Sequence, residues 1–332
     1  MASITLTLRR PNILLRLGSR TSEESLKLQS RPLDPQAPLR LLSFNDLPPW
    51  YQDNPYIRTA YRPVSNSFKH CLHSLSYFHN ETLNIYTHLL PAVLLLLSFT
   101  PYPQSLLREH LPTSTPLDGA IFTLNLLAAL TTFSLSATYH TCMSHSQPIN
   151  AAALLADYAG ILLLILASFV SGIHVGFYCE PALKLLYWAM IAFLVLLTGV
   201  LILHPQLQGP RCRAVRTTAF VATALSGFAP IAHGLWLYGW ADMWGKSGMR
   251  WWLGEGVAYG IGAGFFAGRW PERWVWGLYG GKGKGRWVDV LGGSHQIFHC
   301  LVVVGACVHL WGVWDAWGWV GRGEGLGGCA AI

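Results

Sequence analysis

The sequence predicts an all-α membrane protein built as a bundle of seven transmembrane helices. Of its 332 residues, 52% are hydrophobic and only 12% are charged, whereas soluble globular proteins carry about 25% charged residues. This composition excludes a disordered chain, which needs low hydrophobicity and high charge, and it argues against an ordinary soluble enzyme. The chain also contains seven separate apolar runs, each close to the roughly 20 residues that a helix needs to cross a bilayer.

The expected spans are distributed over most of the chain. We place them at about 84–100, 118–140, 150–172, 183–203, 215–238, 251–268 and 295–317. The fifth and sixth contain scattered Gly and Trp residues, and membrane helices tolerate Gly better than soluble helices do. In the sixth span Gly256, Gly260, Gly264 and Gly268 recur every four residues. Such a strip permits close helix packing, which we expect within the chain, with a dimer interface as the alternative.

The segments outside the spans differ in composition. Residues 1–43 are polar, with Arg, Ser and Pro mixed, and are expected to form a disordered cytosolic tail. Residues 44–83 interleave aromatic residues with turn formers, which predicts an ordered cytosolic or interfacial segment with a helix near 66–80. Residues 84–318 form the predicted seven-transmembrane domain, and the Gly-rich residues 319–332 form an extracytosolic tail.

The basic residues predict the orientation of the chain. With a cytosolic N-terminus, the inward segments hold 18 of the 23 Lys and Arg residues, in agreement with the positive-inside rule. An odd number of spans then places the C-terminus on the extracytosolic side. In so apolar a chain, the net charge of +7 indicates basic loops against anionic lipids and not nucleic-acid binding. The seven Cys residues show no CxxC pair, so they predict neither a zinc ribbon nor a disulfide framework.

Two histidines at the start of the seventh span are candidate metal ligands. His295 and His299 are four residues apart, so they share one helix face and could bind one zinc ion. A pair of interfacial histidines would have the same spacing. The HExxH motif of metalloproteases does not apply, because Gln296 replaces its glutamate. His140 ends the second span, and the predicted orientation places it at the same cytosolic face.

The third span adds a carboxylate at this depth. Asp157 lies one to two turns into that span, so the predicted orientation brings it close to His140, His295 and His299. Three histidines with an open fourth position form a catalytic type of zinc site, in which Asp157 can orient the zinc-bound water and accept its proton. A buried, ion-paired acid and a fourth zinc ligand are the alternatives for Asp157.

Ser136 lies one helical turn before His140, on the same helix face. Its hydroxyl could hold Asp157 or donate a hydrogen bond to a substrate carbonyl oxygen. The alternative is a hydrogen bond to the backbone of residue 132.

Other ionisable residues lie near the expected ends of the spans. We interpret His174, His204 and His309 as interfacial residues, and we expect Glu255 to reach water near the outer end of the sixth span. None of them is needed for the predicted zinc site.

Three motifs resemble those of a known family. ETLNIYTH at 81–88, SATYH at 136–140 followed by Asp157, and HQIFH at 295–299 are similar to the motifs of the progestin and adiponectin receptor family, which includes the hemolysin III proteins. The stretch NDLPPWYQDNPYIRTAYRP at 45–63 resembles the segment that precedes the first span in the adiponectin-receptor-like branch. The resemblance covers about residues 44–318, and the chain looks like a fungal member.

The resemblance implies a seven-helix bundle with a cytosolic N-terminus and a Zn²⁺ ion held by His140, His295 and His299. It places Asp157 and Ser136 beside the zinc-bound water. Members of the family are linked to ceramide hydrolysis, and fungal members to lipid and zinc homeostasis.

The first motif contributes Glu81, Asn84 and His88, for which the family resemblance implies a structural role. Glu81 could also contact a zinc ligand from behind. The connection at 269–294 is longer than is usual in the family and is rich in Gly, Lys and Trp. A flexible loop at the lipid surface is the interpretation we draw from its composition.

Two functions fit these residues, and a third fits less well. The first is a zinc-dependent hydrolase of ceramide or a related lipid amide. The second is a receptor in which the zinc is structural and an extracellular ligand changes the helix arrangement. A zinc transporter would need ligands across the whole bilayer, whereas the candidates cluster on one side. The expected location is the plasma membrane or the endoplasmic reticulum, and the sequence indicates no oligomeric state.

Overall fold

Long helices dominate the computed structural model of the chain, which describes residues 41–99, 115–207, 209–280 and 283–328. Most of the predicted N-terminal tail therefore lies outside the described residues, as does the end of the predicted C-terminal tail. The long helices are α3 (Thr82–Ser98), α5 (Pro116–Cys142), α6 (Gln147–Gly176), α7 (Pro181–Leu203), α8 (Arg213–Leu225), α9 (Phe228–Lys246), α10 (Met249–Gly268) and α12 (Ser294–Gly321).

The starts of these helices follow from local sequence. α5, α6 and α7 each have a Pro in the first turn, where its missing N–H group costs nothing. In α5 the capping is reciprocal, because the Thr115 hydroxyl accepts from the Asp118 backbone N–H and the Asp118 carboxylate accepts from the Thr115 backbone N–H. These signals explain why the predicted spans and the observed helices agree within a few residues at these ends.

The fifth span differs most from the prediction. The single helix expected at 215–238 is two helices, α8 and α9, with a break at Ser226–Gly227. α9 also continues eight residues beyond the predicted end, and Gly239 interrupts it with a φ of 76°. Glycine adopts this left-handed backbone conformation at little cost, so the residue that weakens the helical pattern in the sequence is the one that allows the bend.

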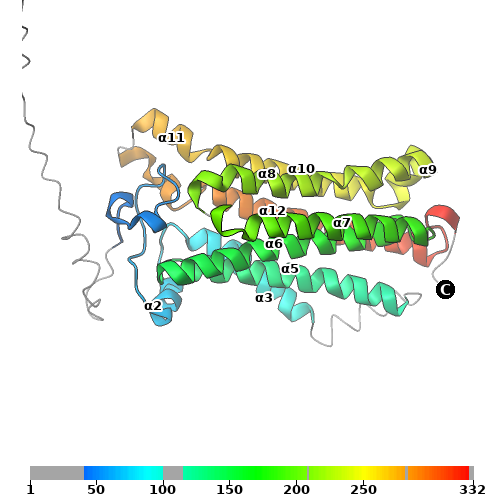
Figure 1. Cartoon of the computed structure of the whole chain (residues 1–332), viewed down its shortest axis with the longest axis horizontal. Helices are drawn as coiled ribbons and strands as arrows, with labels where there is room; N and C mark the ends of the chain where they lie inside the picture. Colours follow the sequence, from blue (N-terminus) through cyan, green and yellow to red (C-terminus); the bar gives the residue numbers. More distant parts are fainter. Residues whose placement is uncertain (1–40, 100–114, 208, 281–282, 329–332) are drawn as a thin grey trace, which may run out of the picture. The chain divides into compact units, whose positions relative to one another are not determined.

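The helices form a ring that α12 completes by packing between α10 and α3. Along the ring, α3 contacts α5, α5 contacts α6, α6 contacts α7, α7 contacts α8, and α8 contacts α10. α12 packs along α10 and also contacts α3 and α6, and Figure 1 shows these helices running lengthwise beside one another. We call the end at which α5 finishes and α6 and α12 begin the histidine end, and the other end the opposite end.

The outer surface of the ring is apolar. Leu94, Leu196 and Val257 are 67%, 67% and 60% exposed, which suits contact with lipid chains and not with water. Five helical segments are long and apolar enough to cross a membrane: α5, α6, α7, α8 with α9, and α12. α3 is apolar but shorter, and α10 falls outside this group because its Gly, Trp and charged residues lower its hydropathy.

Exposed tryptophans occur at both ends of the ring. Trp236 and Trp240 of α9 are 80% and 63% exposed near the opposite end, and Trp270, Trp274 and Trp287 are about half exposed near the histidine end. Trp is enriched at both interfaces of a membrane, because its ring is amphipathic. The two groups therefore indicate where the headgroup layers contact the bundle.

The glycine strip of α10 does not pack as predicted. A Cβ atom added at Gly256, Gly260, Gly264 or Gly268 would meet no other described atom within 4 Å. Close packing inside the chain uses Gly262 instead, where an added Cβ would lie 3.2 Å from the side chains of Leu301 and Phe298. The strip therefore lies on the outside of the bundle, because the rotation of α10 turns a different face toward α12.

The long connection before α12 is folded where the structure describes it, contrary to the expected flexible loop. It contains α11 (Glu272–Tyr279) and a 3₁₀ helix, η6 (Gly283–Asp289). Two of its carboxylates bind the N-terminal segment: Glu272 accepts from the Asn54 amide at 2.9 Å, and Asp289 accepts from the Thr59 hydroxyl at 2.6 Å. Because both acids are buried, these contacts give the connection a fixed position.

The segment before α3 contains a helix that is shorter than the one expected near 66–80. It contains α2 (Phe68–His73) and three 3₁₀ turns, η1 (Phe44–Asp46), η2 (Pro49–Tyr51) and η3 (Ser74–Ser76). The buried Arg62 attaches it to the end of α5, because its guanidinium donates to the carbonyls of His140 and Thr141 and to the Ser74 hydroxyl. A cation is favourable at this position because the last carbonyls of a helix carry a partial negative charge.

Three residues expected at an interface or in water are instead buried in polar pairs. His174 contacts Asp118 at 2.6 Å, and His309 contacts Glu255 at 2.8 Å. The other ring nitrogen of His309 lies 2.9 Å from the Ser171 hydroxyl. Ionisable side chains within a membrane usually pair inside the bundle because exposure to lipid is costly, and this requirement outweighs their position near helix ends.

We expect Arg62→Gln to destabilise the fold, because it removes a buried cation and leaves carbonyls at the end of α5 without a donor. The melting temperature of the purified protein should fall by roughly 5 °C or more. Thermal unfolding followed by tryptophan fluorescence measures this. Arg58→Gln is the matched control, since the Arg58 side chain makes solvent-exposed hydrogen bonds, and an equal loss in both variants would contradict the role given to Arg62.

Candidate metal centre

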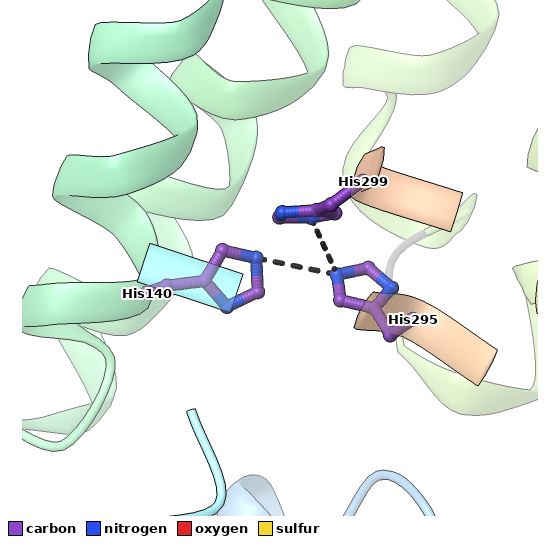
Figure 2. Close-up of side chains that lie close together, drawn as sticks. All are labelled: His140, His295 and His299. Atoms are coloured by element: carbon purple, nitrogen blue, oxygen red, sulfur yellow. Dashed lines mark hydrogen bonds between the residues drawn. The ribbon is translucent and has the colours of Figure 1, made fainter. Parts of the chain in front are cut away.

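Two helices bring three histidines together at the histidine end. His140 lies in the last turn of α5, and His295 and His299 lie in the first two turns of α12. Figure 2 shows the three imidazole rings pointing toward one another. His140 and His299 are 2% exposed, whereas His295 is partly exposed, so the centre is buried on two of its three sides. The sequence predicted this grouping from helix spacing and from the direction of the chain.

The nitrogens that meet at the centre are the three Nε2 atoms. Nε2 of His295 lies 3.2 Å from Nε2 of His140 and 3.1 Å from Nε2 of His299. One donor atom from each of the three residues lies within 4.8 Å of the others, and among the described residues this is the group of side chains that could hold a metal ion.

Hydrogen bonds behind two of the rings fix their tautomers. Nδ1 of His140 lies 2.8 Å from a carboxylate oxygen of Glu81, and Nδ1 of His299 lies 3.0 Å from the backbone carbonyl oxygen of Asn84. Both partners only accept, so each Nδ1 carries the proton. In the neutral rings each of these two Nε2 atoms is then unprotonated, and its lone pair is directed at the centre.

This arrangement fits a cation. The Nε2 atom of His295 can donate to one neighbour at most, so at least one of the two short nitrogen–nitrogen contacts would otherwise bring lone pairs together. A metal ion that accepts all three lone pairs removes this conflict. Imidazoles whose other nitrogen donates to a carboxylate or a carbonyl are the usual form of histidine ligands.

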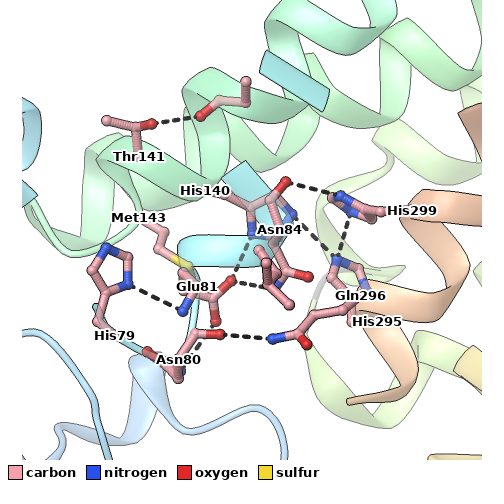
Figure 3. Close-up of polar contacts among 12 residues, drawn as sticks. His79, Asn80, Glu81, Asn84, His140, Thr141, Met143, His295, Gln296 and His299 are labelled. Carbon is pink, nitrogen blue, oxygen red and sulfur yellow. Dashed lines mark hydrogen bonds and ion pairs between the residues drawn. The ribbon is translucent and has the colours of Figure 1, made fainter. Parts of the chain in front are cut away.

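Glu81 takes part in several polar contacts on the far side of His140 from the other two histidines. Figure 3 shows these contacts. The Glu81 carboxylate accepts from His140 and also from the Asn84 amide at 2.6 Å and the Asn80 amide at 3.1 Å. Burial raises the pKa of Glu81, but the hydrogen bonds from the His140 ring and the Asn84 amide lower it overall. The carboxylate is therefore ionised at neutral pH and places a negative charge beside the histidines.

The structure places Asp157 on the same side of the bundle interior as Ser136 and His140, close enough for electrostatic interaction with both. The Asp157 carboxylate is buried, interacts with the Ser136 hydroxyl and lies within electrostatic reach of His140. Among the described residues Asp157 is not part of the group of converging metal donors. The role predicted for Asp157, as a neighbour of the metal and not a ligand, stays a prediction.

The remaining residue of the first motif, His88, lies against His299. Its ring is stacked on that of His299, with 3.9 Å between the ring centroids and 4° between the planes. Asn84 and Glu81, one and two turns earlier on α3, hold the ligand histidines from behind. The first motif therefore surrounds the centre, which goes beyond the structural role that the family resemblance implied.

Gln296 has a role that the sequence reasoning missed. Its side-chain oxygen accepts from the backbone N–H groups of Gly292 and Gly293, and its amide donates to the carbonyls of Val290 and Asn80. It therefore caps the first turn of α12 and joins it to the segment before α3. A Gln at the third position of a helix is a known capping signal, so this role could have been found from the sequence.

Comparison with known proteins identifies the family. Residues 76–310 match the haemolysin-III related proteins. The chain belongs to this family. It is similar to ADIPOR-like receptor IZH1 of Eremothecium gossypii, with 32% identity over 87% of this chain and 86% of that protein. ADIPOR-like receptor IZH2 of Saccharomyces cerevisiae is 33% identical, over 84% of each chain.

Animal and plant relatives extend this similarity. The adiponectin receptor protein of Drosophila melanogaster is 32% identical over 84% of this chain and 60% of its own length. Heptahelical transmembrane protein 3 of Arabidopsis thaliana is 33% identical over 81% of this chain and 85% of its own. Together with the apolar helices, these relatives show that the chain is an integral, multi-pass membrane protein of the adiponectin-receptor-like group.

We expect Glu81→Gln to weaken metal binding by roughly tenfold to a hundredfold, because a neutral amide accepts a weaker hydrogen bond from His140 and does not balance the charge of the ion. Bound metal, measured by elemental analysis after dialysis against graded chelator, tests this. Glu180→Gln, a similar change at the start of α7 at the opposite end, serves as the control. Equal metal retention in the two variants would show that Glu81 does not support the centre.

Proposed function

We propose that the protein is a zinc-dependent hydrolase that cleaves ceramide or a related lipid amide within the membrane. The observation that carries the proposal is the convergence of three Nε2 atoms, from His140, His295 and His299, beside a buried carboxylate outside that group. Three histidine ligands leave a zinc ion one open position, which is typical of catalytic sites, whereas structural sites usually have four protein ligands.

Zinc is the ion that suits this donor set, because imidazole nitrogens in a three-histidine group are common in zinc enzymes. When bound, zinc polarises a carbonyl oxygen and lowers the pKa of water. The protein holds the ligand histidines in the required tautomer, through the Glu81 carboxylate for His140 and the Asn84 carbonyl for His299. A carboxylate behind a ligand histidine also raises the basicity of that ligand.

Asp157 is the group placed to hold and move a proton. In the proposed reaction its carboxylate accepts a proton from the attacking water as the water oxygen bonds to the amide carbon. Asp157 then gives that proton to the amide nitrogen, the C–N bond breaks, and a fatty acid and a sphingoid base leave. The Ser136 hydroxyl, which interacts with Asp157, keeps the carboxylate oriented during both transfers.

The surroundings of the centre favour a lipid as the substrate. The core beyond the histidines consists of small and apolar side chains, including Ala92, Ala129 and Phe133. The outside of the same helices exposes large aliphatic side chains. A water-soluble substrate would lose its hydration to reach such a site, whereas a lipid amide already lies at this depth in the membrane.

We also infer that the histidine end faces the cytosol. Support comes from the cysteines as well as from the basic loops. Cys179, just after α6 at the opposite end, is disulfide-bonded, and disulfides persist in oxidising compartments. Cys71, Cys142 and Cys212, at the histidine end, are free thiols. This distribution agrees with a reducing environment at the histidine end.

A receptor is the second candidate, and the names of the relatives favour it. In that case a ligand at the opposite end would alter the packing of the helices, and the zinc ion would fix their arrangement. The buried pairs of His174 with Asp118 and of His309 with Glu255 would then belong to the part of the bundle that responds. The two candidates differ in what they require of Asp157.

We expect Asp157→Asn to abolish the release of fatty acid from ceramide by the purified protein in lipid nanodiscs, while most of the zinc remains. The amide cannot accept the proton from water, but it leaves the three histidines unchanged. His299→Ala, as the comparison, should lose both zinc and activity. An inactive, zinc-loaded wild type would support the receptor, and loss of zinc from Asp157→Asn would make Asp157 a ligand.

The orientation can be measured with Cys212, which is partly exposed between α7 and α8. In sealed cells a membrane-impermeant maleimide should label Cys212 only after the membrane is permeabilised, because the thiol faces the cytosol. Cys179 should react only after a reductant is added. A Cys212→Ser variant identifies the labelled band. Labelling of Cys212 from outside intact cells would reverse the proposed orientation.

A further inference from the structure

His88 is the buried polar group of the metal centre that the proposed reaction does not use. The residue is 4% exposed, and neither ring nitrogen makes a hydrogen bond within the described part of the chain. The backbone of His299 lies within reach of at most a weak polar contact with one ring nitrogen. Stacking on the His299 ring and an edge contact with Phe133, whose centroid is 5.0 Å away, account for its packing but not for its nitrogens.

An imidazole is a costly choice for packing alone. Leaving a buried donor or acceptor without a partner costs about 1–3 kcal/mol, and His88 has one of each in its neutral form. A phenylalanine of similar shape would stack on His299 and contact Phe133 without this cost. The position of His88 therefore indicates a polar partner that comes from outside the chain.

The location of His88 restricts what that partner can be. On one side lie the three converging histidines. On the other side, one turn further along α3, Ala92 begins the apolar cluster that also contains Ala129 and Leu164. A molecule that contacts both regions has a polar group joined to an aliphatic part, which is the structure of a lipid.

We propose that His88 binds the polar group of the lipid substrate by hydrogen bonds, and so selects lipids that carry a hydroxyl or amide next to the cleaved bond. This inference rests on the proposed function. A neutral imidazole offers one donor and one acceptor, and a hydroxyl or a secondary amide offers the complementary pair. A site built to bind such a group rejects analogues that lack it, because its own polar atoms are then left unpaired.

The proposal differs from a role in metal binding. His88 is not one of the residues whose donor atoms converge, among those that the structure describes. Replacing it should therefore leave the zinc content unchanged while ligand binding weakens. A purely structural role would give a different result: His88→Phe would lower the melting temperature and leave ligand binding unchanged. Removal of two unpaired nitrogens should instead leave the protein equally stable or make it more stable.

The test compares His88→Phe with the unmodified His88 in full-length, zinc-loaded protein in nanodiscs. Both carry Asp157→Asn, so that ligand is not consumed. Binding of radiolabelled short-chain ceramide is measured by scintillation proximity, together with the melting temperature and the zinc content. We expect about tenfold weaker binding, unchanged zinc, and an equal or higher melting temperature. His88→Gln, which keeps a donor and an acceptor, should restore much of the binding.

Controls separate this outcome from a general effect of removing a polar atom. Tyr238→Phe removes a buried, unpartnered hydroxyl in α9 near the opposite end and should not change ceramide binding. His88→Met provides the same test if His88→Phe does not accumulate. Diacylglycerol as a second ligand shows which group is bound: weaker binding of both lipids in His88→Phe indicates the hydroxyl, and of ceramide alone the amide.

Two results would overturn the proposal. The first is ceramide binding by His88→Phe that equals binding by the unmodified residue, and the second is the absence of ceramide binding when His88 is present. Failure of the proposed function looks different. If the protein with Asp157 intact binds ceramide in a His88-dependent way and releases no fatty acid, then the hydrolase is wrong and the binding role of His88 stands.

Discussion

The hydrogen bonds behind the histidines, from Nδ1 of His140 to Glu81 and from Nδ1 of His299 to the Asn84 carbonyl, determine much of the structure. They start from the first turn of α3 and reach two different helices, α5 and α12. An acceptor behind each ring fixes both its orientation and its protonation. Without them the three Nε2 atoms would not be directed at one point, and a buried imidazole would lose its partner in a medium that offers no water.

Buried polar side chains also need hydrogen-bonding partners along the rest of the bundle. Asp118, Asn125, Thr132, Ser136 and His140 lie on one face of α5, because their spacings of seven and four residues are close to whole numbers of helical turns. Three of them pair with α6: Asp118 with His174, Asn125 with Ser171, and Thr132 with the Gly160 carbonyl. A shift of one helix along the other would separate all of these pairs. Polar contacts therefore fix the relative position of two helices whose apolar surfaces alone would permit sliding.

Much of the fold was predictable because bilayer thickness sets the length of an apolar run. The starts of α5, α6 and α7 were also predictable, from proline and capping residues. The break at Ser226–Gly227 and the outward direction of the Gly256–Gly268 strip were not. A break depends on how its neighbours pack, and the face that a helix turns inward depends on its rotation, which an evenly apolar sequence does not determine.

Some features of the site were likewise predictable from the sequence, and others were not. The spacing of His295 and His299, together with the direction of the spans, was enough to predict that they meet His140. The Asn84 carbonyl that holds His299 could not be predicted, because a backbone atom has no side-chain signal. The pairing of His309 with Glu255 was missed because its members are far apart in the sequence. Gln296, by contrast, lies in a capping pattern that could have been recognised.

The late position of α12 in the chain has a consequence for biosynthesis. Among the described α-helices it leaves the ribosome after all the others, yet it supplies two of the three converging histidines and contacts α3, α6 and α10. Until it inserts, Glu81 and His140 lie in a bundle that lacks His295 and His299. The three Nε2 atoms can therefore converge only after α12 has inserted. A chain that stops short of α12 leaves His140 without the two histidines that meet it.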